Sequence, residues 1–256
     1  MDRREFIRCG VGLAGIIATG KAPAAVVRSL LGNRASFTDN KEIPTCADYI
    51  QDGLIGMWDG IENKGYGRHD ATTSTWVDLS GNQRDATLSG TYSWGKNYWQ
   101  VKSYYGGGMA RWNGTNLGDD QTIEFVIAYI RVGQYSRIIA EGQSVASPCA
   151  ESTNLYMYGY GKDARGPAVS LGTDIHKHTI THPSGGQMRY YLDGELLWTM
   201  TTSNNSTGAT YAYFGNRADK NRGIDAKYYT MRRYNRVLAD DEIALNYAID
   251  KARFGL

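Results

Sequence analysis

The stretch Gln187-Met188-Arg189-Tyr190-Tyr191-Leu192-Asp193-Gly194-Glu195-Leu196-Leu197-Trp198-Thr199-Met200 decides the fold class of this chain. Two runs rich in apolar and aromatic residues flank the pair Asp193-Gly194, and both residues of the pair tolerate the positive φ angles of a two-residue hairpin turn. The pattern predicts two antiparallel strands, 187–192 and 195–200, joined by that turn. A helix across this segment would refute the architecture that follows.

The rest of the chain repeats this pattern of short strands between turns. The longest run, Thr122–Ile130, is apolar on both alternations after its first residues, which indicates a strand in the middle of a sandwich. A helix is predicted from Asp240, because the carboxylates at its start suit the positive end of a helix dipole. Further strands are predicted at 54–58, 137–140, 155–160, 211–216 and 227–234. We therefore expect an all-β fold, an antiparallel two-sheet jelly-roll sandwich with a short C-terminal helix.

The composition agrees with this fold class. The 256 residues include 31 Gly and 19 Tyr but 5 Pro, a mixture that suits strands joined by tight turns. A chain of this length is usual for one large sandwich. Charges nearly balance, with 28 Lys and Arg against 26 Asp and Glu. Because counterion release needs a clustered excess of positive charge, we expect neither nucleic acid nor an anionic membrane as a partner.

The first residues have the parts of a bacterial export signal. Arg3 and Arg4 resemble the paired arginines of a twin-arginine signal, a short apolar run follows, and Ala22-Pro23-Ala24 supplies an Ala-x-Ala exit. The apolar run is far shorter than the roughly 20 residues of a membrane-spanning helix, so no stable span is expected. The sequence predicts a helical signal segment at 1–24, cleaved after Ala24, and a periplasmic or extracellular protein. The alternative is a basic N-terminal helix on a cytosolic protein.

The segment between the signal and the sandwich has no clear hydrophobic period. Residues 25–46 are predicted to form a linker, and the sandwich domain is expected to cover 47–256. Cys46 and Cys149 remain after cleavage. A disulfide between them and a reduced pair are both compatible with the sequence, because two cysteines define no framework.

Four segments, taken in order, resemble a known family. They are Gly53-Leu54-Ile55-Gly56-Met57-Trp58, Trp76-Val77-Asp78-Leu79-Ser80-Gly81-Asn82, Tyr191-Leu192-Asp193-Gly194-Glu195-Leu196, and Arg233-Tyr234-Asn235-Arg236-Val237-Leu238 with Asp241-Glu242-Ile243. Their order and spacing over 48–254 resemble the laminin G-like group of concanavalin A-like lectin/glucanase domains. The resemblance implies two stacked, curved sheets that bind carbohydrate or protein on the concave face or on its rim loops.

The resemblance also raises calcium as a cofactor. Several laminin G-like domains hold calcium with carboxylate and carbonyl oxygens on rim loops. The candidate ligands here are Asp59, Asp78, Asp219 and Asp225, although their spacing matches no dedicated calcium loop. No other cofactor is expected to be required.

A cluster of histidines offers a second metal hypothesis. His176, His178 and His182 occupy alternating positions and would share one face of a strand. Two imidazoles on one face are able to ligate a transition metal. We favour the alternative, an ordinary polar and aromatic sheet face.

The sequence lacks the motifs that would indicate catalysis. Glycoside hydrolases on this fold place carboxylates at alternating positions of one strand, and no Glu-x-Asp-x-Glu run occurs. The nearest carboxylates, Asp119, Asp120 and Glu124, straddle a turn and the start of a strand. We therefore expect that the protein is not an enzyme.

Alternating tyrosines form the candidate ligand site. Tyr156, Tyr158 and Tyr160 project from one face of their predicted strand, and a tyrosine offers a flat apolar face with a polar tip. Sugar rings would stack there if this face is the concave sheet, whereas core packing is the alternative. The sequence thus favours an exported, non-catalytic domain that binds a glycan or a surface protein. The alternatives are a structural or adhesive component of a cell-surface or phage-like assembly and, third, a glycan-active hydrolase.

Overall fold

The computed structural model describes residues 43–104, 106–113, 120–133, 136–141, 147–151, 154–158, 169–170, 173–184, 186–201 and 211–256, with the backbone alone at 141, 147–151, 154–158, 169–170 and 201. The described residues belong to one compact unit, Ile43–Leu256. This unit begins four residues before the predicted start at Ala47. The reason is that Cys46 is fully buried and the Pro44 carbonyl accepts a hydrogen bond from Arg253 Nη1 at 2.6 Å.

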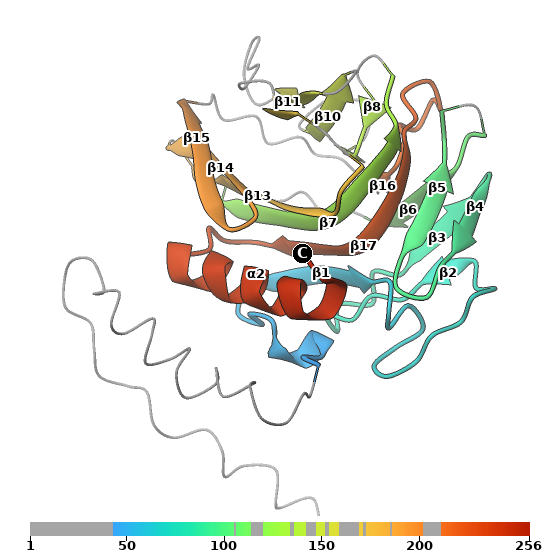
Figure 1. Cartoon of the computed structure of the whole chain (residues 1–256), viewed down its shortest axis with the longest axis horizontal. Coiled ribbons are helices and arrows are strands. Elements are labelled where there is room, and N and C mark those ends of the chain that lie inside the picture. Colours follow the sequence, from blue (N-terminus) through green and yellow to red (C-terminus); the bar gives the residue numbers. More distant parts are fainter. Residues whose placement is uncertain are drawn as a thin grey trace, which may run out of the picture. The chain divides into compact units, whose positions relative to one another are not determined.

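The largest sheet is antiparallel and eight-stranded, with the order β15-β14-β13-β7-β17-β5-β4 and with β1 also paired to β17. Its central strands are β7 (Gln121–Arg131) and β17 (Asp225–Tyr234). β17 pairs with β5 along its first half and with β1 along its second half, so the sheet divides there. Figure 1 shows how the sheet curves from β15 through β13 and β7. The other strands are β1 (Leu54–Asp59), β4 (Tyr92–Trp94), β5 (Trp99–Lys102), β13 (His176–His182), β14 (Gln187–Leu192) and β15 (Glu195–Thr201).

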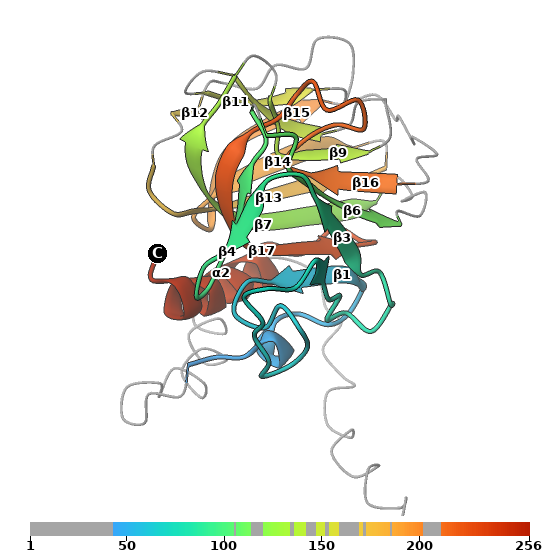
Figure 2. The ribbon, with the colours of Figure 1, turned by 90° about the vertical axis from the view of Figure 1, so that its right-hand side faces the viewer.

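A second, five-stranded sheet has the order β2-β3-β6-β16-β9, and Figure 2 shows β3, β6, β16 and β9. Its strands are β2 (Thr75–Trp76), β3 (Ala86–Ser89), β6 (Met109–Asn113), β9 (Ile139–Glu141) and β16 (Tyr211–Phe214). A four-stranded sheet, β12-β11-β10-β8, completes the described strands. It consists of β8 (Ser136–Arg137), β10 (Ser147–Glu151), β11 (Asn154–Tyr158) and β12 (Val169–Ser170).

The main core lies between the large sheet and the five-stranded sheet. Trp58 and Trp99 come from the large sheet, Trp76 and Trp112 come from the five-stranded sheet, and each is at most 1% exposed. The rings of Trp58 and Trp112 meet across the core with centroids 4.7 Å apart. Large aromatic side chains of both sheets fill the space between them, so the two sheets form the predicted β-sandwich.

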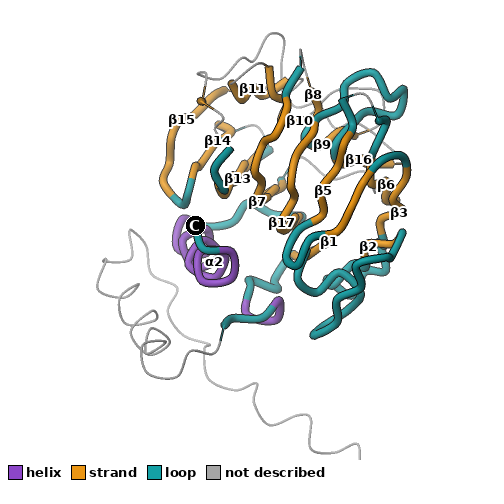
Figure 3. Tube along the Cα trace, turned by 45° about the vertical axis from the view of Figure 1, so that its right-hand side comes forward, coloured by secondary structure: helices purple, strands orange, loops and turns teal. Residues whose placement is uncertain are grey.

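The helix α2 (Asp240–Phe254) covers the other face of the large sheet, and Figure 3 shows it beside the strands. The helix ends at Gly255, whose φ of 75° allows its N–H to reach the carbonyl of Lys251. The short 3-10 helix η1 (Cys46–Asp48) lies close by, since the N–H of Ile50 donates to Asn246 of α2. None of the described helices has the length and the hydropathy of a membrane-spanning segment.

A buried ionic network joins α2 to the large sheet. The Lys177 ammonium lies 2.7 Å from Glu124 and 3.5 Å from Asp250. Arg232 lies opposite Glu124 in the strand register, and its Nε is 2.9 Å from Glu124 Oε2. Arg232 Nη1 also donates to Asp250 at 2.9 Å. All four side chains are fully buried, and two cations balance two carboxylates, so the network is neutral.

The predicted hairpin, central strand and C-terminal helix are confirmed. Asp193 and Gly194 have φ angles of 50° and 82°, as a two-residue turn requires. The single strand predicted at 137–140 is wrong. Ile138 instead separates β8 from β9, which belong to different sheets.

Candidate functional site

Two of the three tyrosines predicted to bind a ligand lie on the four-stranded sheet. Tyr156 and Tyr158 belong to β11, where the backbone alone is described, and Tyr160 lies outside the described residues. Arg3, Arg4, Ala22 and Ala24 of the predicted signal also lie outside them. Both predictions therefore stay predictions.

The four candidate calcium ligands do not converge. Asp78 closes its own turn, because its carboxylate accepts hydrogen bonds from the backbone of Met57, Ser80 and Arg84 at 2.9–3.0 Å. Asp219 pairs with Arg217 at 3.0 Å. Asp225 begins β17 and accepts the N–H of Tyr104. Asp59 is fully buried at the end of β1 and does not lie in a rim loop.

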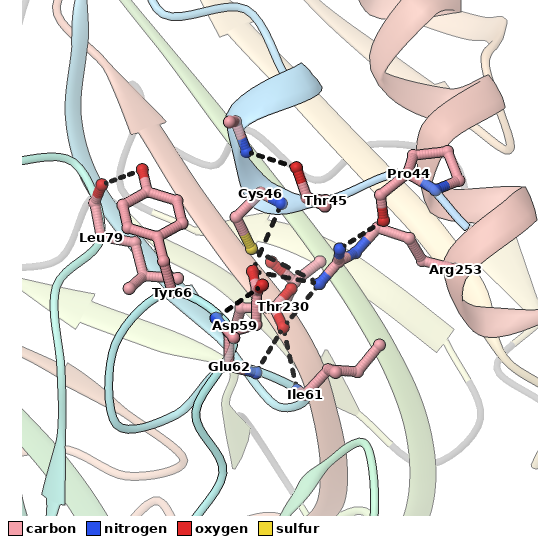
Figure 4. Close-up of polar contacts among 12 residues, drawn as sticks. Pro44, Thr45, Cys46, Asp59, Ile61, Glu62, Tyr66, Leu79, Thr230 and Arg253 are labelled. Carbon is pink, nitrogen blue, oxygen red and sulfur yellow. Dashed lines mark hydrogen bonds and ion pairs between the residues drawn. The ribbon is translucent and has the colours of Figure 1, made fainter. Parts of the chain in front are cut away.

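Asp59 belongs to a different cluster, drawn in Figure 4. The potential ligand atoms of Cys46, Asp59 and Glu62 lie within 4.8 Å of one another. Among the described residues, this is the group whose ligand atoms are close enough to hold one metal ion. Arg253 lies at the same place. Its Nη2 is 2.9 Å from Asp59 Oδ1, 3.4 Å from Cys46 Sγ and 3.7 Å from Glu62 Oε2.

The cation that this cluster holds is therefore the Arg253 guanidinium. Burial raises the pKa of the Cys46 thiol, which keeps it protonated and makes it a poor metal ligand. The thiol is free, so it forms no disulfide, and the side chain of Cys149 lies outside the described part. We assign the cluster to the structural connection between the start of the domain and α2.

The histidines of β13 lie on a strand, as predicted, but do not form a metal site. His176 Nδ1 lies 2.8 Å from Asp193 Oδ2. His178 Nδ1 lies 2.7 Å from the Tyr190 hydroxyl, and its ring stacks on Phe125 with centroids 4.8 Å apart. Burial lowers the pKa of His178 to about 3, so the ring is neutral. Within the described residues, no histidine joins a group of three potential ligands.

A pocket of about 510 Å³ lies on the face of the five-stranded sheet that points away from the core. β3 alternates buried and exposed residues, and Thr87 pairs with Arg111 of β6, which pairs with Tyr213 of β16. These three side chains therefore form one row across the sheet. The row lies on the face opposite to the one that carries the buried residues of the same strands. We call this site the β3–β6–β16 pocket. Its polar lining is Asp85, Thr87, Ser89, Arg111, Asn113, Tyr213 and Lys220.

The polar lining of the β3–β6–β16 pocket is available to a ligand. Except for Asp85, none of these side chains makes a hydrogen bond or an ion pair within the described part of the chain. Asp85 is the single carboxylate among the lining residues, and its Oδ1 accepts the N–H of Asp78 at 2.9 Å. The pocket thus offers hydroxyl, amide, guanidinium and ammonium groups but lacks a pair of carboxylates.

This pocket was not predicted from the sequence. Its residues come from three strands and the segments next to them, and they fall in separate stretches of the chain, 85–89, 109–113 and 213–220. The one local signal is the alternation of apolar and polar residues in β3 and β6, which predicts an exposed face but not its neighbours.

Solved structures share the fold. Trypanosoma rangeli sialidase in complex with sialic acid aligns with a TM-score of 0.60 at 18% identity, over 82% of this chain and 34% of that one. The receptor-binding domain of botulinum neurotoxin C/D mosaic serotype aligns with a TM-score of 0.61 at 16% identity, over 78% and 52%. The binding domain of botulinum neurotoxin DC in complex with rat synaptotagmin II gives 0.61 at 17%, over 78% and 52%.

The chain thus spans between a third and about half of the length of these structures. Neither a protein-family model nor a curated protein matches the sequence. At this identity the likeness establishes the fold, a β-sandwich, and leaves function to the residues of this chain.

Proposed function

We propose that this protein is a non-catalytic recognition domain that binds carbohydrate in the β3–β6–β16 pocket. The observation that carries the proposal is the set of polar side chains there without partners in the described part of the chain. The pocket volume of about 510 Å³ falls within the range of about 300–1,000 Å³ typical of small-ligand sites. Hydroxyl and amide groups match a polyhydroxylated ligand, and Tyr213 adds an amphipathic aromatic ring.

The composition of the pocket also supports a role without catalysis. Two-carboxylate glycoside hydrolysis needs a second acid about 5–9.5 Å from the first. Asp85 has no carboxylate partner among the lining residues and already accepts a backbone hydrogen bond. The pocket therefore has the means to hold a sugar but not the usual pair of groups to cleave it.

The family, export and cofactor proposals rest on separate observations. The order of the four sequence segments, together with the sandwich, supports a laminin G-like domain of the concanavalin A-like group. Arg3 and Arg4 with the Ala-x-Ala exit at Ala24 support export by the twin-arginine route to the periplasm or beyond. We propose that binding needs no calcium, because the four candidate aspartates are dispersed and engaged by protein groups.

A surface protein is the second candidate ligand. One structural neighbour is a binding domain in complex with a protein, synaptotagmin II. In this chain Leu196 and Leu197 are 50% and 48% exposed on β15, at the edge of the large sheet. Exposed apolar residues on a sheet edge are typical of protein contacts.

A glycan array probed with the full chain tests the proposal. We expect binding that Thr87→Trp abolishes, because the indole fills the pocket from an exposed position on β3. The matched control is Thr199→Trp, which places the same ring at an exposed position on β15. A wild-type chain that binds no glycan, or glycan binding that Thr87→Trp leaves intact, would overturn the proposed function.

A further inference from the structure

The lining of the β3–β6–β16 pocket carries an excess of positive charge. Arg111 and Lys220 are both exposed and have no ion pair in the described part of the chain, whereas Asp85 is the single acid. The chain as a whole is nearly neutral in comparison, with a formal net charge of +2 over 256 residues. Arg217, in the loop that carries Lys220, is paired with Asp219 at 3.0 Å.

Arg111 is positioned in advance for a planar anion. It lies in the middle of β6, between Thr87 on one side and Tyr213 on the other. Its guanidinium carbon lies 3.9 Å from the centre of the Tyr211 ring, and this cation–π contact restrains the long side chain. Stacking on a ring occupies the face of the guanidinium and leaves its N–H donors at the edge, in the fork geometry that matches a carboxylate or a sulfate.

Lys220 is held at the pocket by a braced loop between β16 and β17. Its φ of 59° and the bond from its N–H to the Arg217 carbonyl at 2.9 Å define a tight turn. The buried side chain of Asn216 accepts the N–H groups of Arg217 and Arg222 at 2.8 and 3.2 Å. The lysine stem passes beside Gly107, where a Cβ would lie 3.8 Å from Lys220 Cδ, an ordinary van der Waals contact.

Resting on the proposed function, we infer that the ligand is an acidic carbohydrate whose carboxylate or sulfate is bound by Arg111 and Lys220. The Arg111 side chain is arranged before the ligand arrives, so little of its conformational entropy is lost on binding. Thr87, Ser89 and Asn113 remain for the sugar hydroxyls. An anionic group satisfies two charges that have no ion pair within the described part of the chain, whereas a neutral sugar does not.

The test is isothermal titration of the full chain with two acidic probes and their neutral forms. The first pair is tetragalacturonic acid and its methyl ester, and the second is a heparin-derived tetrasaccharide and its desulfated, carboxyl-reduced form. We expect at least one acid to bind about tenfold or more tighter than its neutral form, as hydrogen bonds to charged groups imply. The acid's affinity should fall with added salt and that of the neutral form should not.

Substitutions identify the residues responsible. Arg111→Gln and Lys220→Gln should each remove most of the preference for the acid over its neutral form. The matched controls are Arg68→Gln and Lys96→Gln, which remove the same charges at exposed positions outside the pocket. Preference for galacturonate indicates a carboxylate ligand, and preference for the heparin fragment indicates a sulfated one.

Two results would overturn the inference. One is equal affinity for the acid and neutral forms. If Thr87→Trp blocks the binding of both forms, this result leaves the proposed function standing. The other is a failure of both acids to bind at about 1 mM, near the weakest affinity that titration measures. Binding of neutral glycans on the array decides the proposed function separately.

Discussion

The buried ionic network beneath α2 gives the sharpest prediction about stability. Replacing Lys177 with Met keeps an unbranched apolar stem of similar length and removes the ammonium group. Glu124 and Asp250 then share a single cation, Arg232, so one negative charge is left buried without compensation. The hydrogen bond from Lys177 Nζ to the Ile243 carbonyl at 3.3 Å is lost as well.

The size of the effect follows from this charge count. Removing one partner of a buried ion pair costs about 3–5 kcal/mol, because the other charge stays in a medium that solvates it poorly. Arg232 still contacts both carboxylates, so we expect the lower part of that range, about 3–4 kcal/mol. With an m-value of about 2–3 kcal/mol/M for a domain of this size, the urea midpoint should fall by about 1–2 M.

The loss should also depend on pH. In the native protein burial disfavours the charged form of Glu124, but Lys177 and Arg232 outweigh it and lower its pKa. A carboxyl whose folded pKa is lowered stabilises the protein above its unfolded pKa, and that contribution disappears as the pH falls. Without Lys177 the folded pKa of Glu124 rises, so protonation removes the buried charge. The destabilisation should therefore be largest at pH 7 and should shrink toward pH 4.

Urea titrations followed by tryptophan fluorescence at both pH values measure this, because Trp58, Trp76, Trp99 and Trp112 are buried. The control Lys96→Met removes an exposed lysine and should change stability by less than about 0.5 kcal/mol. Adding Glu124→Gln to Lys177→Met removes one charge of each sign and should restore part of the lost stability. A Lys177→Met variant within about 1 kcal/mol of wild type at pH 7, or equally destabilised at both pH values, would refute this reasoning.

Three further predictions address the turn, the Arg253 cluster and the N-terminus. Gly194→Ala should cost about 1–3 kcal/mol of stability, since the φ of Gly194 is 82° and the added Cβ would lie 2.8 Å from Tyr247 of α2. The control Gly67→Ala should cost less, because Gly67 has a φ of 67° and its added Cβ would have no atom within 4 Å. Equal urea midpoints for the two variants would contradict the clash. EDTA should leave the thermal unfolding midpoint unchanged, because Arg253 is the cation between Cys46, Asp59 and Glu62, and a fall of several degrees would indicate a metal instead. Arg3→Lys with Arg4→Lys should keep the protein in the cytoplasm of a bacterial host, because lysine retains the charge but not the guanidinium geometry, and unchanged periplasmic recovery would reject the twin-arginine assignment.

The sequence predicted the elements whose causes are local. Asp193-Gly194 specifies its turn through the φ angles of two adjacent residues, and the double apolar alternation of 122–130 requires a strand covered on both faces. The carboxylates from Asp240 onward mark the start of α2. In each case a short window contains the physical reason for the structure, so the pattern could be interpreted without knowledge of the rest of the chain.

The candidate site could not be predicted because its cause is pairing over long distances in sequence. Thr87, Arg111 and Tyr213 become neighbours only through the register of β3, β6 and β16, and Lys220 reaches them from a loop whose geometry depends on the buried Asn216. An isolated arginine on a short strand has the same sequence signature whether it lines a pocket or faces open solvent. The alternation of Tyr156 and Tyr158 likewise indicates a shared face but not which sheet carries it, and their role stays a prediction.

The buried charges of Glu124 and Lys177 have a signal in the sequence. Glu124 interrupts an apolar run, and Lys177 stands between histidines in a strand that the sequence already placed in the sheet. A charge on a buried strand needs a partner, so the sequence predicts that each residue has one. It does not predict that they pair with each other, as the structure shows.

The central claim is that the β3–β6–β16 pocket is the ligand site, and nuclear magnetic resonance tests it most directly. The full chain, labelled with ¹⁵N, is titrated with the glycan that binds most tightly on the array, and the shifted amides are mapped onto the fold. Our account predicts that the largest shifts occur at Thr87, Arg111, Tyr213 and Lys220, and that Thr87→Trp removes them. Shifts confined to Tyr156 and Tyr158 on β11, or to Leu196 and Leu197 on β15, would contradict it.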